Sequence, residues 1–170
     1  MSAKAATEQD SVGRWLDEIV GELPHIDLDV EAAVQRVHKL NRHIDRRMKE
    51  TLAEFNLSHG EWGILARLSL SGPPYRSSPG QLSEKEGLSS GAMTNRLDQL
   101  EKAGLVRRLP DPDDRRALQV ELTDKGRKLW LKAVDAQAAR EAALTAVLDK
   151  RELEQLNALL RKVLVGLESG

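Results

Sequence analysis

The feature that most constrains the fold is a run of four local signals between residues 78 and 122: a capped helix, a turn, a second helix and a charged hairpin. Ser78 and Gln81 make a capping box, in which the two residues satisfy each other's free backbone N–H groups, and Pro79 suits the first helical position. This first helix is expected to end near Gly87. Residues 88–90 then form the turn.

A second helix is predicted to begin at Gly91, with Leu97, Leu100 and Ala103 recurring as one buried stripe. Its first turn is small and polar. This suits a recognition helix, because small residues let the backbone approach the bases while polar side chains pair with groove edges. The residues that we expect to contact DNA here are Ser89, Ser90, Gly91, Met93, Thr94, Asn95 and Arg96.

Residues 105–109 and 117–122 flank a turn rich in Pro and Asp, which predicts a β-hairpin. The second strand alternates an apolar face with a solvated one, namely Leu118, Val120 and Leu122 against Gln119 and Glu121. Arg115 and Arg116 are the last two residues of this turn, and we expect them to project into the narrow minor groove, whose negative potential attracts arginine. The alternative is a solvated loop neutralised by its own aspartates. A helix pair followed by such a hairpin is typical of a winged helix-turn-helix.

The rest of the chain is predicted to be helical, so the fold class is mainly α with a small β-hairpin wing and a helical dimerisation region. One expected helix spans residues 11–23, and a second runs from its cap at Asp29 to about residue 55 with a core stripe along it. A third is capped by Ser58 and runs through residue 70, and Thr123 and Asp149 cap the last two. Residues 72–77 are expected to form a loop, whose Tyr75 and Arg76 either brace the fold or touch the DNA backbone.

These helices carry more apolar surface than one small lobe can cover, which favours a two-fold dimer. A dimer also holds two recognition helices about 34–36 Å apart, the spacing of successive major-groove faces on one side of DNA. The alternative is an intramolecular cap. The expected divisions are a flexible tail over 1–10, N-terminal dimerisation helices over 11–57, a DNA-binding region over 58–122 and C-terminal dimerisation helices over 123–170.

Several blocks of residues, in this order, resemble the multiple antibiotic resistance regulator (MarR) family of bacterial transcription factors. The blocks are residues 57–62 (LSHGEW), 93–97 (MTNRL), 100–108 (LEKAGLVRR), 111–116 (DPDDRR) and 122–126 (LTDKG). The resemblance covers the chain from about Val30 to its C-terminus. It implies an obligate dimer with two winged helix-turn-helix lobes below a helical dimerisation region, and a small-molecule pocket between them.

The added N-terminal helix with its Trp15 resembles one branch of that family, which includes urate-responsive and PecS-like repressors. In that branch a Trp of the extra helix and two arginines are tied to ligand response. The resemblance carries these roles to Trp15, Arg96 and Arg108. An Asp of the same site corresponds to Gly63, directly after Trp62, so the resemblance argues against urate itself as the ligand.

The helix after Asp29 also carries a basic run opposed by Asp45 alone, made of Arg36, Lys39, Arg42, Arg46, Arg47 and Lys49. One interpretation is a solvated face. The other is the anion-attracting wall of a ligand cavity.

The composition sets further limits. A chain of 170 residues with 31% charged and 40% hydrophobic residues is ordinary for one domain. The formal net charge is −1, so phosphate contact would depend on local groups such as Arg107 and Arg108 beside Arg115 and Arg116. No membrane span or signal peptide is expected, and the absence of cysteine excludes disulfides and thiol chemistry, which makes the cytoplasm the expected location.

No metal, cofactor or catalytic residue is expected. The four histidines, His25, His38, His43 and His59, do not form a recognised ligand pair on one helical face. No phosphate-binding glycine loop or nucleophile elbow is present either, which argues against an enzyme. The sequence therefore predicts a DNA-binding regulator, acting as a ligand-responsive homodimeric repressor at an inverted-repeat operator and bound by a small anionic or aromatic effector. The alternative is an architectural or protein-interaction winged-helix protein without an effector.

Overall fold

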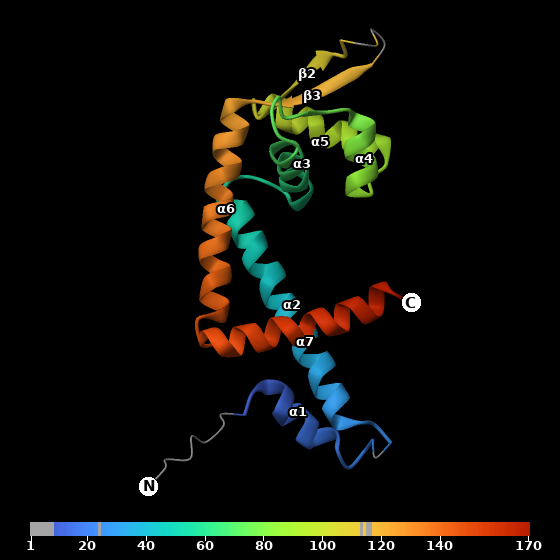
Figure 1. Ribbon diagram of the computed structural model, residues 1–170, viewed down its shortest axis with the longest axis vertical. Helices are drawn as coiled ribbons and strands as arrows, with labels where there is room; N and C mark the ends of the chain where they lie inside the picture. Colours follow the sequence, from blue (N-terminus) through green and yellow to red (C-terminus); the bar gives the residue numbers. More distant parts are fainter. Residues whose placement is uncertain (1–8, 24, 113, 115–116) are drawn as a thin grey trace. The chain divides into compact units, whose positions relative to one another are not determined.

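The computed structural model describes residues 9–23, 25–112, 114 and 117–170, which form two compact units, Met1–Arg46 and Arg47–Gly170 (Figure 1). The elements in chain order are α1 (Ser11–Ile19), α2 (Leu28–Glu54), α3 (His59–Leu70), β1 (Arg76–Ser77), α4 (Pro79–Glu86), α5 (Ser90–Lys102), β2 (Val106–Pro110), β3 (Leu118–Leu122), α6 (Asp124–Thr145) and α7 (Lys150–Glu168). The predicted mainly helical class with a small wing is confirmed. No helix in the described ranges is long and apolar enough to cross a membrane.

The first unit contains α1 and the N-terminal part of α2. Asp10 is the N-cap of α1, and its carboxylate accepts hydrogen bonds from the backbone N–H groups of Val12 (3.1 Å) and Gly13 (2.8 Å). The flexible tail expected over 1–10 therefore does not reach Asp10, because a capping side chain is held at the helix start. The helix ends at Ile19, earlier than the expected residue 23.

The start of α2 is capped by Asp27 rather than by the expected Asp29. The Asp27 carboxylate accepts hydrogen bonds from the N–H groups of Asp29 (3.0 Å) and Val30 (3.1 Å). The apolar stripe predicted as core stays 42–58% exposed over its first half, at Val30, Val34, Val37, Leu40 and Ile44. That part of the core prediction was wrong for the single chain, because α1 is the only other helix among the described residues of the unit and it is short.

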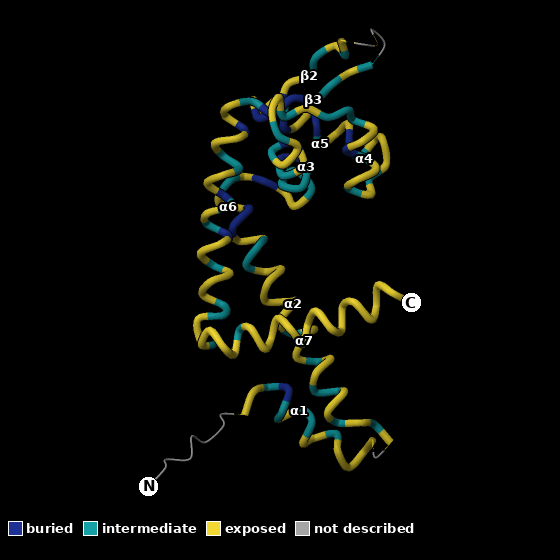
Figure 2. Tube along the Cα trace, in the orientation of Figure 1, coloured by how far each residue is buried: buried dark blue, intermediate teal, exposed yellow. Residues whose placement is uncertain are grey.

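The second unit is built on α3, α4, α5 and a three-stranded antiparallel sheet of order β1-β3-β2. The wing hairpin is confirmed, with residues 106–110 paired to residues 118–122. The segment 72–77 is not entirely a loop, since Arg76 pairs with Glu121 and adds a strand to the other edge of β3. Figure 2 shows most of the buried positions in this unit, with a further one on α1. Its core includes Leu52, Leu57, Ile64, Leu65, Leu68, Leu82, Leu97, Leu100, Val106 and Val120.

Three side chains lie on the side opposite to the one predicted. Ala103 is exposed because it is the C-cap of α5 and stands past the buried stripe. Leu118 is 46% exposed near the outer end of the wing, whereas Glu121, expected on the solvated face, is only 7% exposed. Glu121 is buried because β1 and β2 each bring an arginine to its carboxylate.

The predicted starts of the last two helices are confirmed. Thr123 caps α6, and Asp149 forms a capping box with Glu152 at the start of α7. The two helices differ in burial, because α6 packs against α3 and buries Ala133 and Gln137, whereas α7 buries none of residues 150–168. The exposed apolar side chains of α7 include Leu156, Leu159, Leu160, Val163, Leu164, Val165 and Leu167.

The C-terminal end of α2 belongs to the second unit and is tied to α6 by buried polar contacts. The hydroxyl of Thr51, which is fully buried, donates to Oε1 of Gln137 at 2.8 Å. Arg140 donates to the same hydroxyl (2.5 Å) and pairs with Glu54. This connection places the end of α2 with the DNA-binding region, rather than with the N-terminal helices as the expected boundary at residue 57 would have it.

Candidate DNA-binding interface

The turn between α4 and α5 is built from local signals that the sequence predicts. Ser78 and Gln81 form the capping box of α4, and Pro79 is the first residue of the helix. Gly87 ends the helix in the left-handed conformation (φ 62°). A side chain disfavours this conformation, so glycine suits the position. Ser89 then caps α5 by accepting from the N–H of Ala92 (3.3 Å). The helix begins at Ser90, one residue before the predicted start.

The first turns of α5 divide into an exposed face and a buried one. The exposed positions are Ser89, Ser90, Gly91, Thr94 and Asn95. Met93, expected among the DNA contacts, is instead 1% exposed and packs in the core with Leu97 and Leu100. We therefore remove Met93 from the set, because a side chain buried between helices cannot reach a base. Helical spacing puts residues 93, 97 and 100 on one side.

Two exposed residues at the start of α5 are well suited to close contact with a groove. A Cβ added to Gly91 would have open space around it, so no packing contact within the described residues requires a glycine there. Thr94 turns its hydroxyl back to the carbonyl of Ser90 (2.9 Å), whereas the amide of Asn95 makes no hydrogen bond with the described residues. An asparagine amide can bind adenine through two hydrogen bonds in the major groove.

Arg96 is half-buried and lies over the N-terminal turn of α3. A Cβ built on Gly60 would overlap the Arg96 guanidinium, so the glycine makes room for this side chain. A second glycine of α3 has the same role one turn later, because the carboxylate of Glu86 from α4 fills the space in front of Gly63. Glu86 also accepts from Arg67 (2.9 Å).

The carboxylate of Glu86, from another helix, fills the space that an acidic side chain at position 63 would enter. Sequence reasoning missed Glu86, because nothing near it in the chain marks it. An Asp introduced at Gly63 would meet the Glu86 carboxylate, so the substitution would not simply restore the family's acidic group.

Glu121 joins all three strands at the base of the wing. Its carboxylate pairs with Arg76 of β1 and with Arg107 of β2, whose Nε donates at 2.7 Å. Burial alone would raise the pKa of Glu121, but the hydrogen bonds from the two arginines outweigh it and hold the pKa below its ordinary value of 4.5. Of the two roles weighed for Arg76, the structure supports bracing the fold.

The guanidinium of Arg108 is also used within the lobe. It donates to Asp98 at 2.6 Å and to Glu101 at 2.5 Å, and desolvation by burial opposes the increase in pKa that these carboxylates cause. Much of the positive cluster predicted from the sequence is thus neutralised internally. Arg115 and Arg116, the predicted minor-groove contacts, lie outside the described residues.

The start of α6 is fitted closely against the loop that follows α5. The hydroxyl of Thr123 approaches the carbonyl oxygens of Gly104 (2.8 Å) and Leu105 (3.0 Å), and Lys125 donates to that of Ala103 (2.6 Å). A Cβ on Gly126 would overlap the carbonyl of Leu105. The loop after α5 and the start of α6 are therefore held together by side-chain hydrogen bonds to backbone carbonyls and by the close backbone packing at Gly126.

The ligand residues carried over from the resemblance fall in different units. Trp15 belongs to the first unit, where it lines a cavity with residues of α1 and α2. Arg96 and Arg108 belong to the second. Within the described residues, no group of three or more His, Asp or Glu side chains is arranged to hold a metal ion.

A capped helix pair with an exposed polar first turn, backed by a braced hairpin, defines a winged helix-turn-helix DNA-binding protein. The MarR family model matches residues 57–118. The transcriptional regulator PecS of Dickeya dadantii is 32% identical over 154 residues, covering 91% of this chain and 90% of that protein. MarR of Escherichia coli K12 is 30% identical, covering 75% and 88%. The chain belongs to the MarR family, and it is a DNA-binding transcriptional regulator rather than an enzyme.

A solved structure in the same family shows a MarR mutant from E. coli in complex with operator DNA. It is 27% identical to this chain, with a TM-score of 0.60, and the match covers 88% of this chain and 97% of that one.

Proposed function

We propose that the protein is a homodimeric repressor that binds an inverted-repeat operator through the exposed face of α5 and releases it when a small effector binds. The carrying observation is that Gly91, Thr94 and Asn95 are exposed at the start of α5, while residues 93, 97 and 100 fix that helix in the core. The protein thus presents a rigid helix whose N-terminal turn is free to enter a major groove.

The proposed self-association surface is the apolar face that α7 leaves exposed in the second unit. The first half of α2, in the first unit, leaves a further apolar stripe exposed. On α7, Leu156, Leu160, Val163 and Leu167 recur every three or four residues and none is buried. A stripe of this spacing is normally buried against another helix. A second copy of the chain is the occupant we propose, because a two-fold dimer gives two recognition helices to two half-sites.

The effector is proposed to be a small anionic or aromatic molecule, with Trp15, Arg96 and Arg108 as the contacts carried over from the family. Arg96 is the better candidate for a ligand contact, because Arg108 would first have to break its ion pairs with Asp98 and Glu101. By linkage, an effector that lowers the affinity for DNA must have its own affinity lowered by bound DNA to the same extent, typically about 5–150-fold.

The test is a selection of bound sequences from random DNA followed by footprinting of the selected site. We expect a discrete inverted repeat whose half-site centres are about one helical turn, 10–10.5 base pairs, or a multiple of it apart. Protection spread along DNA without a discrete site would instead identify an architectural protein, and it would refute the operator proposal.

A further inference from the structure

The C-terminal end of α2 meets the middle of α6 through polar side chains whose centre is closed off from solvent. Thr51 is fully buried, and Gln137 is only 5% exposed. The Thr51 hydroxyl lies 2.8 Å from Oε1 of Gln137 and 2.9 Å from the carbonyl oxygen of Arg47. Arg140 donates to the same hydroxyl at 2.5 Å and pairs with Glu54. We refer to Thr51, Glu54, Gln137 and Arg140 as the α2–α6 network.

A polar contact at this place fixes direction more than it adds stability. Burying a polar group costs free energy that its hydrogen bonds only partly return, so the net gain is small. A hydrogen bond is satisfied over a narrow range of distance and angle, whereas an apolar contact tolerates sliding. The partners are also supplied in full, because Nε2 of Gln137 donates to Glu141 at 2.9 Å. Satisfied networks of this kind specify one arrangement of the helices that carry them.

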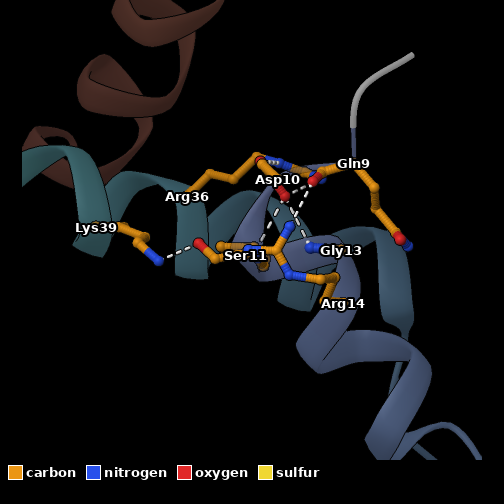
Figure 3. A network of polar contacts seen from close by, with 8 residues as sticks. Gln9, Asp10, Ser11, Gly13, Arg14, Arg36 and Lys39 are labelled. Atoms are coloured by element: carbon orange, nitrogen blue, oxygen red, sulfur yellow. Dashed lines mark hydrogen bonds and ion pairs between the residues drawn. The ribbon is translucent and has the colours of Figure 1, made fainter. Parts of the chain in front are cut away.

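The polar network that joins α1 to α2 lies at the surface instead (Figure 3). Its ion pair, between Asp10 and Arg36, leaves each side chain about half exposed. Water and salt screen such a pair, so its contribution is small. The hydrogen bond between Thr51 and Gln137 is shielded from both, and the geometry that it sets persists at physiological ionic strength.

The α2–α6 network holds the middle of α6 to the DNA-binding lobe. The end of α2 belongs to the core of the lobe through Leu52, which is 2% exposed. The first half of α6 packs against α3, where Ala133 is fully buried. No residue of α6 after Gln137 is buried, and the helix then leads to α7 and its exposed apolar face. The network is therefore the last buried attachment of α6 before the proposed self-association surface.

We propose that the α2–α6 network determines which spacing between operator half-sites the protein accepts. The inference rests on the proposed dimer, in which the direction of α6 beyond Gln137 sets the separation and rotation of the two α5 helices. One base pair of DNA corresponds to about 3.4 Å along the duplex, less than the 5.4 Å of one α-helical turn. A small slide of α6 thus equals a change of one base pair. Thr51 and Gln137 are positioning residues, since buried side chains cannot reach DNA.

The experiment measures the affinity of the full-length protein for duplexes in which the selected half-sites are moved apart or together by one and two base pairs. Wild type should lose about tenfold or more for each shift, because the second half-site is then misplaced. The variant carrying both Thr51→Val and Gln137→Leu should lose less than about threefold. Its stability and its base preference within a half-site should stay unchanged, because replacing both partners of a hydrogen bond by apolar groups is close to neutral.

Two further variants test whether the hydroxyl of Thr51 is responsible. Thr51→Ser keeps the hydroxyl and should retain the spacing preference of wild type. Thr145→Val makes the same change as Thr51→Val at the last residue of α6, outside the network, and should also bind like wild type. Circular dichroism, sedimentation and urea unfolding compare the fold, the dimer and the stability of each variant.

The inference is overturned if the double variant loses affinity at shifted spacings as steeply as wild type. If that variant fails to fold or dimerise, Thr51→Val and Arg140→Gln are compared separately, and an unchanged steepness in both has the same meaning. Wild type that binds every spacing equally would instead refute the dimeric operator on which the inference rests. The two failures are therefore distinguishable.

Discussion

The guanidinium of Arg96 lies over the backbone of Gly60 in α3. It occupies the space that the Cβ of any residue other than glycine at position 60 would fill. Glu86 and Gly63 are related in the same way one turn later. Two glycines on one face of α3 therefore let α4 and α5 bring charged side chains against its backbone. The atoms that meet these two glycines are the charged ends of Arg96 and Glu86.

The first prediction is that Gly60→Ala couples energetically to Arg96. In an Arg96→Ala background, Gly60→Ala should stabilise the protein by about 0.5–1 kcal/mol, because alanine is the better helix former. With Arg96 present the gain should vanish, since the new methyl group displaces the guanidinium. Urea unfolding of the four proteins measures the coupling. Identical effects of Gly60→Ala in the two backgrounds would show that the contact is energetically irrelevant.

A second prediction contrasts two other glycines. Gly126→Ala should destabilise the protein by about 1–3 kcal/mol, because the added methyl group overlaps the carbonyl of Leu105 and a backbone cannot easily retreat. Gly91→Ala is the matched control and should be neutral or stabilising, since its surroundings are open. Denaturant unfolding compares the two. A larger loss of stability at Gly91 than at Gly126 would contradict the packing described at the start of α6.

The third prediction concerns Glu121 and acid. Its pKa is lowered in the folded state, so the carboxylate contributes stability above the ordinary value of 4.5 and loses it as the pH falls through the lowered pKa. At pH 7, Glu121→Gln should cost about 1–3 kcal/mol, because Arg76 and Arg107 lose their shared charge. The gap between wild type and variant should close below pH 4.5.

Urea unfolding at a series of pH values follows this gap directly. Glu84→Gln, at an exposed glutamate of α4, is the control and should leave the pH dependence of stability unchanged. A gap between wild type and Glu121→Gln that stays constant down to pH 3 would mean that the carboxylate does not brace the wing by its charge.

The fourth prediction tests base reading by α5. Asn95→Ala should weaken binding to the selected operator by about 1–3 kcal/mol and relax discrimination at one position of each half-site. Gln99→Ala, at the exposed residue one turn further from the helix start, should keep the base preference. Binding to a panel of single-base operator variants provides the measurement. If Asn95→Ala weakens binding to all operator variants equally, Asn95 only positions the protein on the DNA backbone.

The last prediction separates assembly from folding. Because none of residues 150–168 is buried, Leu160→Glu with Val163→Glu should leave the second unit folded yet abolish the dimer. Sedimentation would then detect a monomer, and operator affinity would fall because two half-sites are no longer linked. Gln155→Glu with Asn157→Glu adds the same charge at polar positions of the helix and should retain the dimer. If the variant with both Leu160→Glu and Val163→Glu still sediments as a dimer, the dimer interface lies elsewhere.

Local chemistry explains why much of this fold can be predicted from sequence. Ser58, Ser78, Thr123 and Asp149 each satisfy N–H groups within three residues, so a short stretch of chain is enough to predict a helix start. The hairpin follows for the same reason, because alternation and turn residues are neighbours. The order of helices and wing, and with it the family, depends on signals of this kind.

Contacts between distant residues were decided only by the tertiary structure. Glu121 looks like a solvated strand residue until Arg76, 45 positions away, reaches its carboxylate. Met93 stands among polar residues in the sequence, yet the packing of α5 on α3 and α4 buries it. Lys39 and Arg42 of the basic run line a cavity because α1 lies against that part of α2. In each case the environment of the residue is set by a partner that only folding brings near, and no local sequence pattern encodes which partner that is.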